Sequence, residues 1–255
     1  MRAVEEARSF DGTPIAFAAE GRGPVVLLLH GFAADHRVNW RAPGVIAALL
    51  RAGRRVIATD ARGHGASGKP HDPAAYADGA MLRDAQVVLD RLGVERVDVV
   101  GYSMGAMVAA RLACVEPRTR SLVLGGVGGD ATPRRSTSRD SPLAEALLAE
   151  DPAAIRDPIA KGFRVFAERM RADRAALAAI ERSNALRSPV CFDAIAVPTL
   201  VLAGEADALI RPPEELVARL PRARLERVPG DHLTAVGHPD FARAIVRFLE
   251  ENSPT

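Results

Sequence analysis

Cysteine is scarce in this chain. Only two cysteines occur among 255 residues, Cys114 in an apolar stretch and Cys191 near the end of a polar one. They form no metal-binding spacing, and two cysteines do not make the disulfide framework that staples small secreted domains. We therefore expect a protein of the reducing cytoplasm.

An excess of charge of one sign is also lacking. The 34 basic and 32 acidic residues leave a formal net charge of +2, and no run of like charges stands out. Nucleic-acid binding depends on a basic surface that neutralises phosphates. Nucleic acid is therefore not expected as a partner.

Long apolar runs are absent as well. No run approaches the roughly 18 to 20 residues that a membrane-spanning helix requires. The N-terminal residues carry acids where a signal peptide needs a basic start followed by an apolar stretch. We expect neither a membrane span nor secretion by that route. With 48% hydrophobic residues, the chain can bury one sizeable core, close to the upper size limit of a single domain.

Apolar strands alternate with helical stretches along most of the chain. Residues 4–19 flank the turn Asp11-Gly12-Thr13-Pro14, which suits an antiparallel hairpin. The alternation that follows predicts an α/β fold with a mostly parallel sheet and helices on both faces. The predicted strands are residues 25–29, 55–59, 97–102, 121–124, 199–203 and 224–228, and the helices are 45–50, 75–92, 104–114, 213–220 and 240–250.

The alternation breaks between residues 130 and 196. Helical periodicity alone continues there, with helices expected over residues 142–150, 152–170 and 174–186, each opening near a Pro or an Asp. We interpret residues 130–196 as an inserted helical cap. The core domain would then comprise residues 1–129 and 197–255.

The strongest chemical signal is the run Gly101-Tyr102-Ser103-Met104-Gly105. It lies between a buried strand and a helix, the context in which a G-x-S-x-G run presents a nucleophilic serine on a strained turn. A serine hydroxyl is a poor nucleophile at neutral pH, so this hypothesis requires a histidine base and a carboxylate behind it. Asp207, just after strand 199–202, and His232, after the last strand, follow Ser103 in the required chain order. They are the predicted acid and base.

Three other carboxylates compete with Asp207. Asp130 follows strand 121–124, a second position at which the acid can occur. Glu205 and Asp231 adjoin turns and are expected to face solvent. Among the other histidines, His30 and His64 are expected to brace loops around the site, and His238 to cap the last helix.

Backbone donors and apolar side chains complete the predicted site. The N–H groups of Met104 and Phe32 are expected to bind the substrate oxyanion, because Met104 opens a helix and Phe32 follows the small Gly31. The Phe32 ring would also line the acyl pocket. In the cap, Phe163 and Phe166, together with Met170, suggest a hydrophobic substrate pocket, although they could equally pack the cap internally.

Taken together, the motifs of this chain resemble those of the α/β-hydrolase fold superfamily, in its capped group with a His-Gly-x loop. The resemblance implies an eight-stranded, mostly parallel sheet and a two-step acyl transfer without metal or cofactor. It also implies that Ser103 stands where epoxide hydrolases and haloalkane dehalogenases of this fold carry an aspartate. The motifs that carry it are His30-Gly31-Phe32, Asp60-x-Arg62-Gly63-His64-Gly65-x-Ser67, Gly101-x-Ser103-x-Gly105, Gly204-x-x-Asp207 and Asp231-His232.

Hydrolysis of a small carboxylic ester is the function that these parts predict, with a small molecule as the substrate. The same apparatus could act on a thioester or a lactone. It could also cleave a carbon–carbon bond as in meta-cleavage product hydrolases, for which Arg164, Arg169 and Arg171 could hold a dienoate carboxylate. The non-enzymatic alternative is a ligand-binding module on this fold. Nothing in the sequence indicates the oligomeric state.

Overall fold

The computed structural model describes residues 4–254 except 78, 130–140, 184 and 186–188. Eight strands form one sheet in the order β1-β2-β4-β3-β5-β6-β7-β8. The strands are β1 (Glu5–Arg8), β2 (Pro14–Glu20), β3 (Val25–Leu29), β4 (Arg55–Thr59), β5 (Val97–Tyr102), β6 (Thr119–Gly125), β7 (Thr199–Gly204) and β8 (Ala223–Val228).

The predicted α/β fold is confirmed. Strands β1 and β2 form the expected antiparallel hairpin, and β2 also runs antiparallel to β4. The pairs from β4 through β3, β5, β6 and β7 to β8 are all parallel. Parallel strands are covered on both faces, which is why β3 is a continuous apolar run and every residue of β5 is buried.

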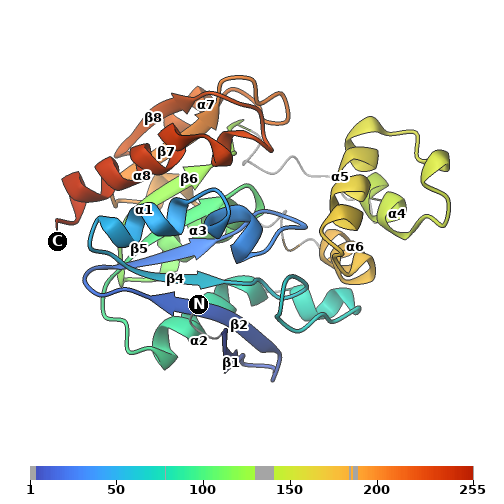
Figure 1. Ribbon diagram of the computed structural model, residues 1–255, viewed down its shortest axis with the longest axis horizontal. Coiled ribbons are helices and arrows are strands. Elements are labelled where there is room, and N and C mark those ends of the chain that lie inside the picture. The colour runs from blue at the N-terminus through green and yellow to red at the C-terminus, as the bar shows by residue number, and fades with distance from the viewer. Residues whose placement is uncertain (1–3, 78, 130–140, 184, 186–188, 255) are drawn as a thin grey trace.

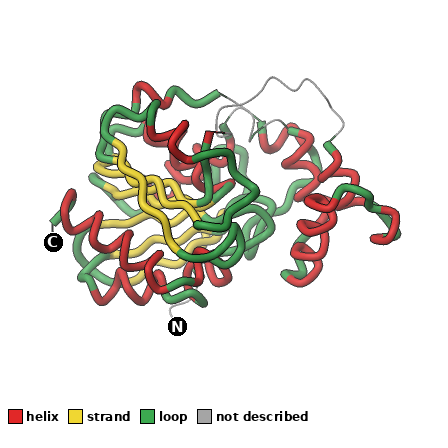
Figure 2. The backbone as a smooth tube through the Cα atoms, turned by 90° about the horizontal axis from the view of Figure 1, so that it is seen from above, coloured by secondary structure: helices red, strands yellow, loops and turns green. Residues whose placement is uncertain are grey.

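Two hydrophobic cores lie on opposite faces of the sheet. Because side chains alternate along a strand, Leu27 and Leu29 of β3 belong to one core while Val26 and Leu28 belong to the other. The first core is covered by α2 (Ala80–Arg91) and α3 (Met104–Val115), and the second by α1 (Val45–Arg51) and α8 (Pro239–Asn252). A short helix, α7 (Pro213–Val217), joins β7 to β8. Figure 2 shows the twisted sheet between its helices.

Two of the predicted helices are each divided into a short turn and a helix. The helix expected over residues 75–92 is a 3₁₀ turn, Pro73–Tyr76, followed by α2, because Gly79 adopts a left-handed conformation with φ of 71°. The helix expected over 152–170 is likewise divided into a turn, Pro152–Ala154, and α5 (Pro158–Arg169). Asp157 caps α5 and Pro158 occupies its first position, so a new helix begins there.

Three helices form a separate layer beyond the end of the sheet toward which β4 and β5 point (Figure 1). They are α4 (Pro142–Leu148), α5 and α6 (Arg174–Arg182). Leu147 and Ile180 of this layer are fully buried, and the Ile180 side chain reaches Gly63 of the sheet-bearing part of the chain. The division into a core (1–129 and 197–255) and a cap (130–196) stays a prediction, since residues 130–140 lie outside the described residues.

Arg164 stabilises this layer from inside. Its side chain is 3% exposed and donates hydrogen bonds to the carbonyl oxygens of Ala146 and Ala149, at 2.8 and 2.7 Å, and to Glu168. These carbonyls belong to the end of α4, where helix acceptors lack partners in the helix itself. Across the described residues, no helix is both long and apolar enough to pass through a membrane.

Candidate active site

Ser103 lies on a strained turn between β5 and α3. Its φ of 51° and ψ of −114° are unusual for a residue other than glycine. Such a conformation costs on the order of 1–3 kcal/mol and persists only where the surroundings fix it. A Cβ on Gly105 would lie well inside 3.0 Å of the Leu29 carbonyl oxygen. A Cβ on Gly101 would lie similarly close to the carbonyl oxygen of Gly105. Both glycines therefore allow the backbone approach that holds the turn.

The predicted triad residues form a continuous hydrogen-bond chain. The Ser103 hydroxyl lies 2.9 Å from Nε2 of His232, and Nδ1 of His232 lies 2.8 Å from Oδ2 of Asp207. The Asp207 side chain is fully buried, and its other oxygen accepts a bond from the Leu209 N–H at 3.0 Å. The carboxylate thus fixes the tautomer in which Nδ1 carries the proton and Nε2 is free to accept one.

The loops that carry Asp207 and His232 touch through small residues. A Cβ on Gly204 would lie 2.5 Å from the carbonyl oxygen of Gly230, so a larger residue would push these loops apart. The Tyr102 hydroxyl donates a 2.6 Å hydrogen bond to the carbonyl oxygen of His232. Burial raises the pKa of Tyr102 well above its usual range, which keeps this hydroxyl a donor.

Two of the competing carboxylates, Asp231 and Glu205, face solvent. Asp231 is exposed and accepts hydrogen bonds from the N–H groups of Leu233 and Thr234, which shapes the turn before α8. Glu205 is exposed, as expected. Asp130 lies outside the described residues.

The predicted oxyanion donors flank the serine. Met104 is the first residue of α3, so its N–H has no acceptor within the helix. Phe32 follows Gly31, whose N–H donates to Oδ1 of Asn39 at 2.8 Å. A Cβ on Gly31 would be 3.6 Å from Cβ of Ser103, which places this loop directly beside Ser103.

The Asp60 motif braces the loops behind the site. Oδ1 of Asp60 accepts from Nδ1 and the backbone N–H of His36 at 2.7 and 2.9 Å, and Oδ2 accepts from the Ala66 N–H. Burial would raise the pKa of Asp60, but the His36 hydrogen bonds hold it well below its usual range. A Cβ on Gly65 would overlap the Asp60 carboxylate, so this position requires glycine.

His30 and His64 brace this region, as expected. Nε2 of His30 accepts from the Ala61 N–H at 2.9 Å. His64 is 2% exposed, and its Nδ1 lies 3.1 Å from the carbonyl oxygen of Arg62, to which it can donate. Burial lowers the pKa of His64 to about 3, so this imidazole is neutral. At the other end of the motif, Arg62 pairs with Asp84 at 2.6 Å. His238 accepts from the Asp240 N–H and caps α8.

A small cavity of about 90 Å³ opens onto Ser103. Phe163 and Phe166 from α5 line it opposite the Phe32 loop, and the rings of Phe32 and Phe163 meet edge to face at 6.0 Å. The lining residues are Gly31, Phe32, Ala34, Val38, Asn39, Tyr102, Ser103, Phe163, Phe166, His232, Leu233 and Val236.

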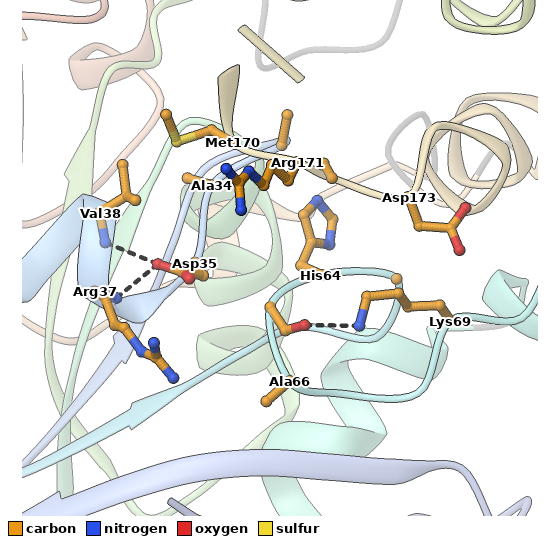
Figure 3. Close-up of a pocket in the computed structure, with 14 residues that line it drawn as sticks. Ala34, Asp35, Arg37, Val38, His64, Ala66, Lys69, Met170, Arg171 and Asp173 are labelled. Carbon is orange, nitrogen blue, oxygen red and sulfur yellow. Dashed lines mark hydrogen bonds between the residues drawn. The ribbon is translucent and has the colours of Figure 1, made fainter. Parts of the chain in front are cut away.

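Met170 lines a different cavity, of about 220 Å³, and not the one at Ser103. Figure 3 shows Arg171 and Asp173, which follow α5, facing Asp35 and His64 across this second space. The Asp35 carboxylate accepts from the N–H groups of Arg37 and Val38, as drawn there. Across the described residues, no group of three or more His, Cys, Asp or Glu side chains is arranged to hold a metal ion.

Two residues of the site escape prediction from the sequence. Tyr102 is visible only as the variable residue of the G-x-S-x-G run, although its hydroxyl holds the His232 loop. Asn39 belongs to no motif, because its partner is a backbone N–H eight residues earlier. A polar residue directly before the fully buried Trp40 is the one local signal for it.

Comparison with known proteins shows which family has this fold. A family model described as the alpha/beta hydrolase fold matches residues 24–158. A putative carbamate hydrolase, RutD, of Variovorax paradoxus is 34% identical over 213 residues, covering 74% of this chain and 76% of that protein. Epoxide hydrolase 3 of Siraitia grosvenorii is 38% identical over 114 residues, which are 44% of this chain and 35% of that enzyme.

Several curated relatives are matched over only about a third of their length. Among solved structures, a thermophilic esterase from Thermogutta terrifontis superposes with a TM-score of 0.79 at 27% identity, over 98% of this chain and 99% of that one. The fold, the extent of the family match and these likenesses agree, and the chain belongs to the α/β-hydrolase family.

Proposed function

We propose that this protein is a serine hydrolase that cleaves small carboxylic esters through an acyl-enzyme. One observation carries the proposal: the hydrogen-bond chain from buried Asp207 through His232 to Ser103, beneath a small and mostly apolar cavity. Belonging to a hydrolase family supports it, because the family supplies the fold on which this chemistry occurs.

The cycle starts with Ser103 attacking the ester carbonyl while Nε2 of His232 takes its proton. Asp207 holds the imidazole and stabilises its cationic form. The developing oxyanion is bound by the N–H groups of Phe32 and Met104. His232 then protonates the leaving alcohol and activates a water molecule, which releases the acid from Ser103.

The size of the cavity favours a small acyl group. About 90 Å³ is well below the roughly 300–1,000 Å³ of pockets that bury drug-sized ligands. Phe163 and Phe166 close the cavity on the cap side and favour an apolar acyl chain. The similarity to an esterase over nearly the whole chain supports ester hydrolysis as the first choice.

The three arginines that could hold a dienoate carboxylate in a carbon–carbon hydrolase do not line the cavity at Ser103. The Arg164 guanidinium is buried against the carbonyls of α4, Arg169 is exposed, and Arg171 borders the other cavity. An epoxide hydrolase is disfavoured because Ser103 stands where that chemistry needs a carboxylate nucleophile. A binding module without turnover would not need an acid and a base in register with a serine.

The test combines labelling with turnover. Wild-type protein should react with a fluorophosphonate probe and hydrolyse p-nitrophenyl esters, fastest with acyl chains of two to four carbons. Ser103→Ala and His232→Ala should abolish both signals while retaining the wild-type melting temperature. Labelling that survives in Ser103→Ala, or folded wild-type protein that cleaves no ester, would overturn the proposal.

A further inference from the structure

Asn39 places a polar side chain in the wall of the cavity at Ser103. It belongs to a short π-helical turn, Arg37–Arg41, and is 5% exposed. Of the other polar side chains that line this cavity, Ser103 and His232 bond to each other and the Tyr102 hydroxyl bonds to a carbonyl. Asn39 is thus the polar group in this wall that the reaction cycle leaves unused.

The orientation of the Asn39 amide is fixed by its partner. The N–H of Gly31 needs an acceptor, so Oδ1 of Asn39 faces it at 2.8 Å and the NH₂ group must face away. Within the part of the chain that the structure describes, Nδ2 is buried and has no hydrogen-bond partner. A buried donor without an acceptor is unfavourable, and native proteins rarely leave one unpaired.

The amide lies close to the reaction centre. A Cβ on Gly31 would be 3.4 Å from Oδ1 of Asn39 and 3.6 Å from Cβ of Ser103. The amide and the nucleophile are therefore separated by little more than one glycine. Asn39 also lines the cavity that an acyl group attached to Ser103 would occupy.

We propose that Nδ2 of Asn39 donates a hydrogen bond to an oxygen in the acyl group, so that the preferred substrates are esters of short alkoxy, keto or hydroxy acids. This inference rests on the proposed ester hydrolysis. Much of the remaining wall is apolar, including Phe32, Val38 and Phe163, so a hydrocarbon acyl group would leave the donor unpaired. A site built to pair a polar group discriminates strongly against the analogue that lacks it.

The experiment compares two esters of equal size. The p-nitrophenyl esters of methoxyacetic and butyric acid differ by one ether oxygen in place of one methylene group. The readout is the ratio of their kcat/KM values, divided by the same ratio in wild-type protein, so that the intrinsic reactivity of each ester cancels. Asn39→Asp keeps an acceptor for Gly31 but removes the donor, and Asn39→Leu removes both.

We expect the ratio to fall about tenfold or more in both variants, the loss that one missing hydrogen bond produces. The matched control is Val236→Ala, which alters the same wall without touching a polar group. It should change both rates in the same direction and leave the ratio within about twofold. A ratio unchanged in both Asn39 variants would overturn the inference and assign Asn39 to holding Gly31 alone.

Failure of the proposed function is distinguishable from failure of this inference. If wild-type protein cleaves neither ester, the side-chain amide signals of Asn39 can still be followed by ¹H–¹⁵N NMR in Ser103→Ala, which needs no turnover. Ethyl methoxyacetate should shift these signals clearly more than ethyl butyrate does. Equal shifts would sink the assignment of Asn39 as a substrate donor, whatever the reaction is.

Discussion

Replacing Asp207 by Asn should disable the proposed triad without unfolding the protein. Oδ1 of Asp207 accepts from the Leu209 N–H at 3.0 Å while Oδ2 faces Nδ1 of His232 at 2.8 Å. In the variant the amide oxygen must face Leu209, so the NH₂ group faces His232. Nδ1 then becomes an acceptor and the imidazole proton moves to Nε2, which can no longer take a proton from Ser103. In a comparable triad this change lowers kcat about 10⁴-fold, equivalent to about 5 kcal/mol.

The assay is kcat for p-nitrophenyl butyrate alongside the second-order rate of fluorophosphonate labelling, which should fall in parallel. Glu205→Gln is the matched control, because Glu205 is an exposed carboxylate two residues earlier, and it should change kcat less than about twofold. The melting temperature shows whether each variant is folded. A folded Asp207→Asn protein that loses less than about tenfold in kcat would refute the tautomer argument.

Three further changes test the structure around the site. Gly105→Ala should lower the free energy of unfolding by about 1–3 kcal/mol or more in urea titrations, because its Cβ would overlap the rigid carbonyl of Leu29; an unchanged midpoint would contradict this. Tyr102→Phe should cost about 1 kcal/mol by the same measurement, through loss of the 2.6 Å bond to the His232 carbonyl, and no loss would show that bond to be dispensable. Folding lowers the pKa of His64 from 6.5 to about 3, so between these pH values the unfolded chain binds a proton that the folded chain does not. The free energy of unfolding therefore declines as pH falls from 6.5 toward 3, by up to about 1.4 kcal/mol per pH unit. His64→Gln should therefore lose less stability than wild type between pH 7 and pH 5, and equal losses would refute the burial of a neutral imidazole.

The positions of Ser103, Asp207 and His232 could be predicted because each follows a strand of a parallel sheet. The carboxyl ends of such strands meet at one edge, so residues 129 and 25 positions apart in the chain come within hydrogen-bond distance. The two glycines of the Ser103 turn are equally local, since each is required by a close backbone approach. Chain order and turn chemistry are therefore sufficient to propose the triad.

The limits of helices were harder to predict where caps interrupt a periodic pattern. The pattern over residues 152–170 continues across Asp157 and Pro158, yet the chain ends one helical turn and starts another helix there. Capping by a side chain and a proline at the first position outweigh the apolar periodicity. Both signals were present in the sequence and point to a boundary that periodicity alone does not show.

The sequence by itself determined the sheet and the three residues of the proposed triad, because buried strands, tight turns and chain order are encoded locally. Only the tertiary structure decided that Arg164 holds α4 and that Met170 lines a second cavity. It also decided that Asn39 lines the cavity at Ser103 with a side-chain N–H donor that has no partner among the described residues. These outcomes depend on which faces of distant segments meet when the helices of residues 141–183 pack against the sheet edge. Helical periodicity shows that a face is apolar, but the surface that covers it is chosen by packing between residues far apart in the chain.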